Sequence, residues 1–264
     1  ALANTESILV AGELVTKLAR EKGVNIYPID CKQSSIFQCL VGEFHNKIEK
    51  IYLTAQGGSL QNIDTLQLQK VTKEELPIHS TSFLDAKLGI DSLSMMSSGF
   101  AAIQAKWLFN LKPTQIEILV HKQAIIDGFV QFEDGGLKAQ TALSDMKLPI
   151  QFALTYPERF KTNIPRFNFM EHPELDFKSP NPALIQNIEL AFFALDEGGT
   201  SACVLNAAND VAVDAFLSHK ISFSEISKLN HDVLKATEII KNPLYDDYLR
   251  SDHTARQTTL KLLQ

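Results

Sequence analysis

The sequence lacks the short motifs that mark the commonest cofactor and catalytic sites. Its 264 residues contain neither a G-x-x-x-x-G-K-[ST] phosphate loop nor a G-x-G-x-x-G dinucleotide loop, so the chain by itself is not expected to hold a nucleotide. A G-x-S-x-G nucleophile elbow and an H-E-x-x-H metal motif are absent too. These absences exclude the most recognisable nucleotide-binding, hydrolase and metalloprotease classes.

Positive charge, cysteine and long apolar runs are also scarce. The net charge of −6 is opposite in sign to the basic footprint of a nucleic-acid binder. The three cysteines, Cys31, Cys39 and Cys203, form no C-x-x-C pair, so we expect reduced thiols, as in a bacterial cytoplasm or a plastid-type organelle. Runs such as Ile116–Val120 are too short to cross a membrane, and no targeting segment is visible. Because the chain opens at Ala1 inside a helix pattern, we interpret its N-terminus as excerpted or processed.

The first part of the chain alternates helix and strand patterns. Asn4 is expected to cap a first helix, residues 24–29 to form a short buried strand that ends at Asp30, and Ser34 or Ser35 to cap a second helix. Further strands are expected over 48–53, 116–120, 129–132 and 137–141. This order predicts an α/β (α+β) domain with a mixed sheet over residues 1–155.

The second part reads as helix after a proline-rich stretch. Residues 156–182 hold five prolines and little periodicity, so we expect a connecting linker over 156–181. Asn181 followed by a proline, and the Ser222–Glu225 capping box, are typical of helix starts. Four helices with short loops predict an all-α bundle over 182–264.

Only weak chemical signals come from the residues alone. A helix is expected from about Ser92, and the serines of residues 92–99 at its start would favour an anion such as phosphate, although serines there are also ordinary caps. His79 and His121 could act as acid–base groups or be ordinary surface or core residues. Asn206 and Asn209 are expected to make buried hydrogen bonds between helices.

Several longer segments carry more information. In chain order they are Ala3–Ser7, Ala11–Val15, Pro28–Asp30, Ile36–Leu40, Leu53–Gly58, Asp91–Ser92, Ala105–Asn110, Asp145–Met146, Tyr156–Arg159, Gly198–Thr200 and Leu205–Asn209. Over nearly the whole chain, their order and spacing resemble the catalytic and C-terminal regions of the 1-deoxy-D-xylulose 5-phosphate reductoisomerase family.

The resemblance implies an activity and a set of cofactors. Members of that family convert 1-deoxy-D-xylulose 5-phosphate to 2-C-methyl-D-erythritol 4-phosphate in the non-mevalonate (MEP) isoprenoid pathway, using NADPH and Mg²⁺ or Mn²⁺. It also implies three parts: a Rossmann-like NADPH domain, a catalytic domain with a dimer contact, and a helical bundle. The first part is expected to be absent from this chain.

The implied metal site is eroded in this sequence. The family holds its metal with an aspartate and a glutamate of an Asp-Ser-Glu-His run, and with the glutamate of an Asn-Lys-Gly-Leu-Glu run. Asp30 matches the aspartate, whereas Lys32 and Ala101 stand where the two glutamates are expected. A lysine close to a divalent ion would cost several kcal/mol, so we expect the chain to bind neither NADPH nor metal well.

The implied substrate site is only partly kept. Cys31 and Gln56 stand at two serine positions, Ser97 and Ser98 replace the phosphate-binding Asn-Lys pair, and Ser92 matches a phosphate-binding serine. His79 matches the histidine of the active-site loop. The last histidine of the family's His-Pro-Gln-Ser-Ile-Ile-His run is Asp127 here.

Four interpretations remain open. The chain is a truncated reductoisomerase that is inactive alone, or a catalytically silent relative that forms a homodimer or a heterodimer with a family member. Alternatively, Lys32 replaces the metal in new chemistry on 1-deoxy-D-xylulose 5-phosphate or another sugar phosphate, or the serine-rich segment serves a non-enzymatic phosphate binder.

Overall fold

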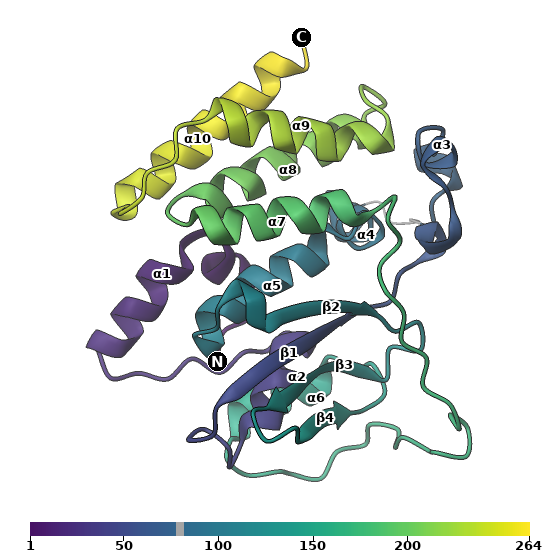
Figure 1. Ribbon diagram of the computed structural model, residues 1–264, viewed down its shortest axis with the longest axis vertical. Coiled ribbons are helices and arrows are strands. Elements are labelled where there is room, and N and C mark those ends of the chain that lie inside the picture. The colour runs from purple at the N-terminus through teal and green to yellow at the C-terminus, as the bar shows by residue number, and fades with distance from the viewer. Residues whose placement is uncertain (78–81) are drawn as a thin grey trace.

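A four-stranded mixed sheet forms the centre of the first half of the chain (Figure 1). The computed structural model describes residues 1–77 and 82–264. The strands are β1 (Ile48–Ala55), β2 (Ile116–Val120), β3 (Ile126–Phe132) and β4 (Leu137–Thr141), in the order β2-β1-β3-β4. β1 runs parallel to β2 and antiparallel to β3, which confirms the expected mixed sheet. The described residues form this one sheet, and the separate nucleotide-binding sheet implied for the family is not among them.

One face of the sheet packs against two helices. Ile51, Leu53 and Val130 point to this face and belong to the main hydrophobic core. The helices that cover it are α2 (Cys31–Leu40), which lies on β3 and β4, and α5 (Met96–Phe109), which lies on β1 and β2. Because side chains alternate along a strand, the residues next to these three in sequence point to the opposite face of the sheet.

That opposite face is covered by the proline-rich segment. Tyr52 packs on Phe129 with 5.3 Å between ring centroids, and Phe177 meets Phe129 edge-on at 5.4 Å. The backbone of Lys178 pairs with Val120 in an isolated antiparallel bridge. Phe177 and Lys178 of the segment 156–181 therefore shield part of the sheet.

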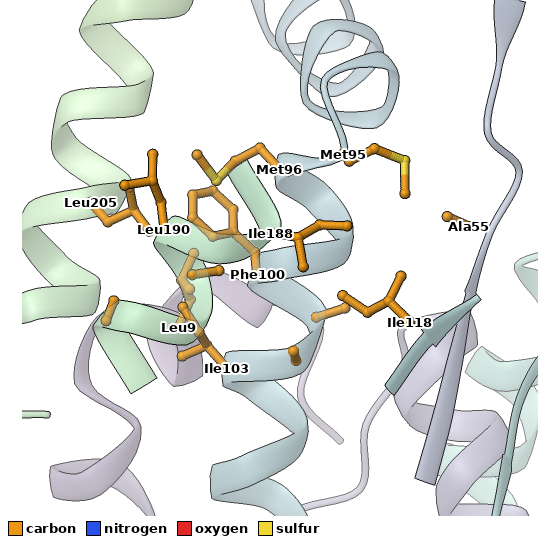
Figure 2. Close-up of a cluster of buried hydrophobic side chains, with 14 of the residues drawn as sticks. Leu9, Ala55, Met95, Met96, Phe100, Ile103, Ile118, Ile188, Leu190 and Leu205 are labelled. Carbon is orange, nitrogen blue, oxygen red and sulfur yellow. The ribbon is translucent and has the colours of Figure 1, made fainter. Parts of the chain in front are cut away.

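Helix α5 links the sheet to the second half of the chain (Figure 2). Its Met96 and Phe100 side chains extend toward Leu190 of α7 (Ile185–Glu197), while Ile118 lies on the side of the sheet. The two helices approach closely at Gly99, where a Cβ atom would lie 2.6 Å from the Cβ of Ala191. One hydrophobic core therefore runs through both halves.

The second half is a helical bundle, as expected. Helix α8 (Ser201–Leu217) packs against α7, α9 (Phe223–Ala236) and α10 (Tyr245–Leu262). The predicted capping box at Ser222 is present. The division into residues 1–155, 156–181 and 182–264 stays a prediction.

The remaining elements are short, apart from the first helix, which Asn4 caps as expected. They are α1 (Thr5–Glu21), η1 (Ser59–Asn62), α3 (Thr65–Leu68), η2 (Lys73–Glu75), α4 (Phe83–Leu93), η3 (Pro113–Gln115) and α6 (Lys147–Thr155). None of the helices in the described part of the chain is long and apolar enough to cross a membrane.

Three of the expected local features are wrong, two of them between residues 24 and 40. Residues 24–29 form no strand, because the only described backbone beside them is that of Leu2, which makes a single bridge to Pro28. The second helix is capped by Asp30, not by Ser34 or Ser35, because the helix starts one turn earlier than its apolar residues indicate.

The helix expected from Ser92 is in fact two helices. Ser92 lies in the last turn of α4, and α5 begins at Met96. Between them Met95 adopts a left-handed conformation (φ 64°) that its fully buried side chain helps to hold. Ser92 is thus near the negative end of a helix dipole, so the phosphate argument based on a helix start does not apply to it.

Candidate functional site

Asp30 uses its carboxylate to start a helix. Its Oδ1 accepts hydrogen bonds from the backbone N–H groups of Lys32 (2.9 Å) and Gln33 (3.1 Å). This is an ordinary N-cap, in which a short acidic side chain satisfies free N–H groups in the first helical turn. The only expected metal ligand that the sequence keeps therefore already has a structural role.

The position of the second expected glutamate, Ala101, is tied through its backbone to the start of α2. Gln33 is fully buried, and its Nε2 donates to the backbone carbonyl of Ala101 over 2.8 Å and to Oε1 of Gln104 at 3.4 Å. Helix α2 is thereby tied to α5 where the family's third ligand is expected. Gln33 Oε1 is buried without a hydrogen-bond partner, so the first turn of α2 retains one unsatisfied acceptor.

Charges of both signs surround the first turn of α2. Burial raises the pKa of the Asp127 carboxyl on β3, and the nearby Lys32 ammonium opposes that shift. Burial, followed by the charges of Asp127 and Asp30, raises the pKa of the Cys31 thiol to about 12. The Cys31 Sγ lies 3.2 Å from the sulfur of Met146. Cys31 is thus a neutral thiol, and the Lys32 ammonium is close enough to lower the pKa of both Cys31 and Asp127 against the effect of burial.

Gln56 follows β1 at a double-glycine turn. Gly57 and Gly58 both have positive φ, and a Cβ atom on Gly58 would lie 2.6 Å from the side chain of Leu93. This contact brings the end of β1 close to the end of α4, where Ser92 is located. Gln56 and Ser92 are both exposed, so their side chains are available to a ligand.

Ser97 and Ser98 lie in the first turn of α5, one turn before Ala101. Ser97 is half-buried, whereas Ser98 is 1% exposed and its hydroxyl has no hydrogen-bond partner among the described residues. Neither side chain carries a positive charge, so the pair lacks the lysine that the resemblance implies for phosphate.

The predicted site residues thus come from four places: the start of α2, the end of β1, the end of α4 and the start of α5. Contacts tie α2 to α5 and β1 to α4. His79 lies outside the described residues. His121 is a core residue, fully buried and stacked on Phe177 with ring centroids 4.5 Å apart.

A buried polar network next to Ser92 was not predicted. The Lys87 ammonium contacts the Asp91 carboxylate (2.7 Å) and Asp210 (3.3 Å), and the amide of Asn209 donates to Asp91 (2.7 Å). Asn230 in turn donates to Asn209, which confirms the expected interhelical bonding of that asparagine. The i,i+4 spacing of Lys87 and Asp91 was the available signal, but it does not reveal burial.

The residues present do not fit a divalent metal ion. Mg²⁺ requires oxygen ligands, in proteins often one or two carboxylates with water and substrate oxygens. Among the described residues, no group of three or more His, Cys, Asp or Glu side chains is arranged to hold a metal ion. Asp30 is engaged as a cap, and Lys32 adds a repulsive charge. What remains can offer hydrogen bonds to a polar ligand, but no Lewis acid.

Two family models match this chain. The model described as "1-deoxy-D-xylulose 5-phosphate reductoisomerase C-terminal domain" matches residues 26–109, and "DXP reductoisomerase C-terminal domain" matches residues 142–258. A 1-deoxy-D-xylulose 5-phosphate reductoisomerase from Phocaeicola vulgatus is 46% identical over 263 residues, which cover 100% of this chain and 68% of that protein.

Solved structures of reductoisomerases are also similar to this chain. The reductoisomerase from Zymomonas mobilis in complex with NADPH superposes with a TM-score of 0.92 at 32% identity, over 100% of this chain and 68% of that chain. A DOX-P reductoisomerase in complex with NADPH, fosmidomycin and magnesium gives a TM-score of 0.88 at 31% identity, over 99% and 69% of the two chains.

Proposed function

Because the chain belongs to the 1-deoxy-D-xylulose 5-phosphate reductoisomerase family, we propose that it is a member that keeps the fold without turning over 1-deoxy-D-xylulose 5-phosphate by itself. The family activity belongs to isoprenoid biosynthesis by the MEP pathway and uses NADPH and a divalent metal. The proposal is that this chain lost the metal part of that chemistry.

The observation that carries the proposal is that, among the described residues, no three His, Cys, Asp or Glu side chains are arranged to hold a metal ion. At the implied ligand positions, Asp30 caps α2, and the side chains of Lys32 and Ala101 offer no oxygen atom. Without a cation to polarise the substrate ketone, the rearrangement loses its electrophile. Lys32 is a poor substitute, because a single ammonium cannot coordinate several substrate oxygens as a divalent ion does, and its charge also acts on Asp127.

The experiment is a turnover assay of the purified chain. NADPH oxidation in the presence of 1-deoxy-D-xylulose 5-phosphate and Mg²⁺ is expected to stay at the rate seen without protein, while the Phocaeicola vulgatus relative serves as positive control. Substrate- and metal-dependent oxidation by the chain alone would refute the proposal.

A family member without catalytic activity would still have another function, and we propose that this chain pairs with a second copy of itself or with an intact family member. Support comes from apolar side chains that α6 and the segment after it expose to solvent, where they would favour burial against a partner. They are Ile150, Leu154, Phe160, Phe169 and Met170. Light scattering after gel filtration is expected to give twice the mass of the chain. A monomer both alone and with the Phocaeicola vulgatus relative would contradict pairing.

Sugar-phosphate binding without turnover is the second candidate. It is favoured by the buried, unpartnered hydroxyl of Ser98 beside Ser97. Calorimetry with 1-deoxy-D-xylulose 5-phosphate is the test, with Ser98→Ala as the variant. Heat of binding that the variant abolishes would support it, and no heat with the unmodified chain would remove it.

A further inference from the structure

A cavity of about 510 Å³ lies away from the predicted site, between α1, residues 24–28, α2 and the end of α5. Its lining contains none of Asp30, Cys31, Lys32, Gln56, Ser92, Ser97, Ser98 or Ala101. Six aromatic side chains line it: Tyr27, Phe37, Phe44, Trp107, Phe109 and Tyr156. The volume and the cluster of aromatic side chains are typical of sites for small organic molecules.

The aromatic side chains of this cavity hold one another in place. Phe37 meets Tyr27 edge-on at 5.6 Å and Tyr156 at 5.2 Å. The Trp107 indole lies against Gly12 of α1, where a Cβ atom would come within 2.2 Å of the ring, and the Lys106 ammonium lies 4.7 Å from the ring centroid. Such fixed rings form a preorganised surface, which lowers the entropy cost of binding a flat ring system.

Arg20 gives the cavity its charge. It is the only charged residue among the described residues that line it. Its Nε donates to the backbone carbonyl of Thr16 at 3.4 Å, and within residues 1–77 and 82–264 its guanidinium forms no ion pair with a carboxylate. A guanidinium free to make paired hydrogen bonds selects a carboxylate or sulfonate.

We propose that this cavity binds a planar aromatic anion, with the rings against Trp107 and Phe37 and the anionic group at Arg20. The ligand class follows from the two features together, because the aromatic lining favours a flat apolar body and the single cation favours one negative group. The site does not depend on the metal chemistry or on pairing.

The chain supplies its own probe, because Trp107 is its only tryptophan. Anilinonaphthalene sulfonate is a suitable test ligand, since it is an aromatic anion that accepts excitation energy from tryptophan. Titration is expected to quench Trp107 emission in a saturable, one-to-one manner. N-phenylnaphthylamine provides the neutral counterpart with similar rings.

Arg20→Gln tests the charged part of the site. It is expected to weaken binding of the sulfonate about tenfold, which corresponds to about 1.4 kcal/mol, and to change binding of the neutral probe less than twofold. Lys22→Gln is the matched control, because it removes the same charge from an exposed residue outside the cavity. Equal losses from both variants would overturn the proposal, since net charge alone would then explain binding.

Ala19→Phe tests the location independently. Ala19 lines the cavity and is half-buried, so the added ring is expected to fill the space and abolish binding of both probes, with circular dichroism confirming the fold. Should one variant fail to fold, the other still decides. Sulfonate binding that survives Ala19→Phe, or that leaves Trp107 emission unchanged, would place the ligand elsewhere and refute the proposal.

Discussion

The side-chain amide of Gln33 donates to the backbone carbonyl of Ala101 over 2.8 Å, across 68 residues of sequence. The bond joins the first turn of α2 to α5, and both groups are buried. In the family these two positions are expected to carry a histidine and a metal-binding glutamate. Two neutral residues joined by a hydrogen bond thus stand at positions where the resemblance implies a histidine and a charged metal ligand.

Gln33→Ala is expected to destabilise the protein by about 1–3 kcal/mol, because it removes a buried hydrogen bond and leaves a small cavity. Urea unfolding followed by circular dichroism measures the change. Gln257→Ala, at an exposed position of α10, is the control and is expected to change stability by less than about 0.5 kcal/mol. Equal effects of the two variants would show that the α2–α5 bond contributes nothing.

Lys87→Met is expected to cost about 3–5 kcal/mol, because Asp91 would then be a buried carboxylate without its cation. The double variant Lys87→Met/Asp91→Leu is expected to recover most of that loss, since it removes both charges. Thermal unfolding of the two variants provides the comparison. A double variant as unstable as the single one would mean that side-chain packing, rather than charge, determines the stability of this site.

Gly99→Ala is expected to push α7 away from α5, because the new methyl group would lie 2.6 Å from Ala191 and 3.2 Å from the carbonyl oxygen of Asn187. Overpacking of this kind costs about 1–3 kcal/mol. Ser97→Ala is the control, because it also introduces an alanine, at a half-buried position in the same helical turn. Unchanged stability of Gly99→Ala would contradict the close helix contact.

All three cysteines are expected to react slowly in the folded protein. Burial raises the pKa of Cys31 and Cys203 to about 12 and that of Cys39 to about 11, from an ordinary value of 9.0. A raised pKa keeps the thiol protonated, so at pH 8 far less of Cys31 is the reactive thiolate than in an ordinary exposed cysteine. Ellman's reagent is expected to react slowly until denaturant is added and then to titrate three thiols. Rapid reaction of a thiol in the native protein at pH 8 would be inconsistent with this burial.

Most of the fold could be predicted from the sequence. Alternating apolar residues located β2, and capping residues such as Asn4 and Ser222 located helix starts, because these signals are local. The strand expected over residues 24–29 failed because a strand needs a neighbouring backbone, which local pattern does not report. The division of the Ser92 region into α4 and α5 was missed because the left-handed Met95 is held by tertiary packing.

The candidate site was less predictable. Matching of motifs assigned Asp30, Lys32 and Ala101 to one site, which stays a prediction, and it did not indicate that Gln33 would bond to Ala101 or that Asp30 would cap α2. It also missed the electrostatic effect of Lys32 on the pKa of Asp127 and the buried pair of Lys87 and Asp91. Such contacts between distant residues depend on the folded arrangement.

Binding of Mn²⁺ measured by electron paramagnetic resonance tests the central claim most directly. With an excess of the chain, the signal of free Mn²⁺ is expected to keep its full intensity, whereas the Phocaeicola vulgatus relative lowers it. Lys32→Glu, a change at a half-buried position, is expected to introduce weak binding. Loss of the free-ion signal with the unmodified chain, restored by Asp30→Asn, would contradict the account.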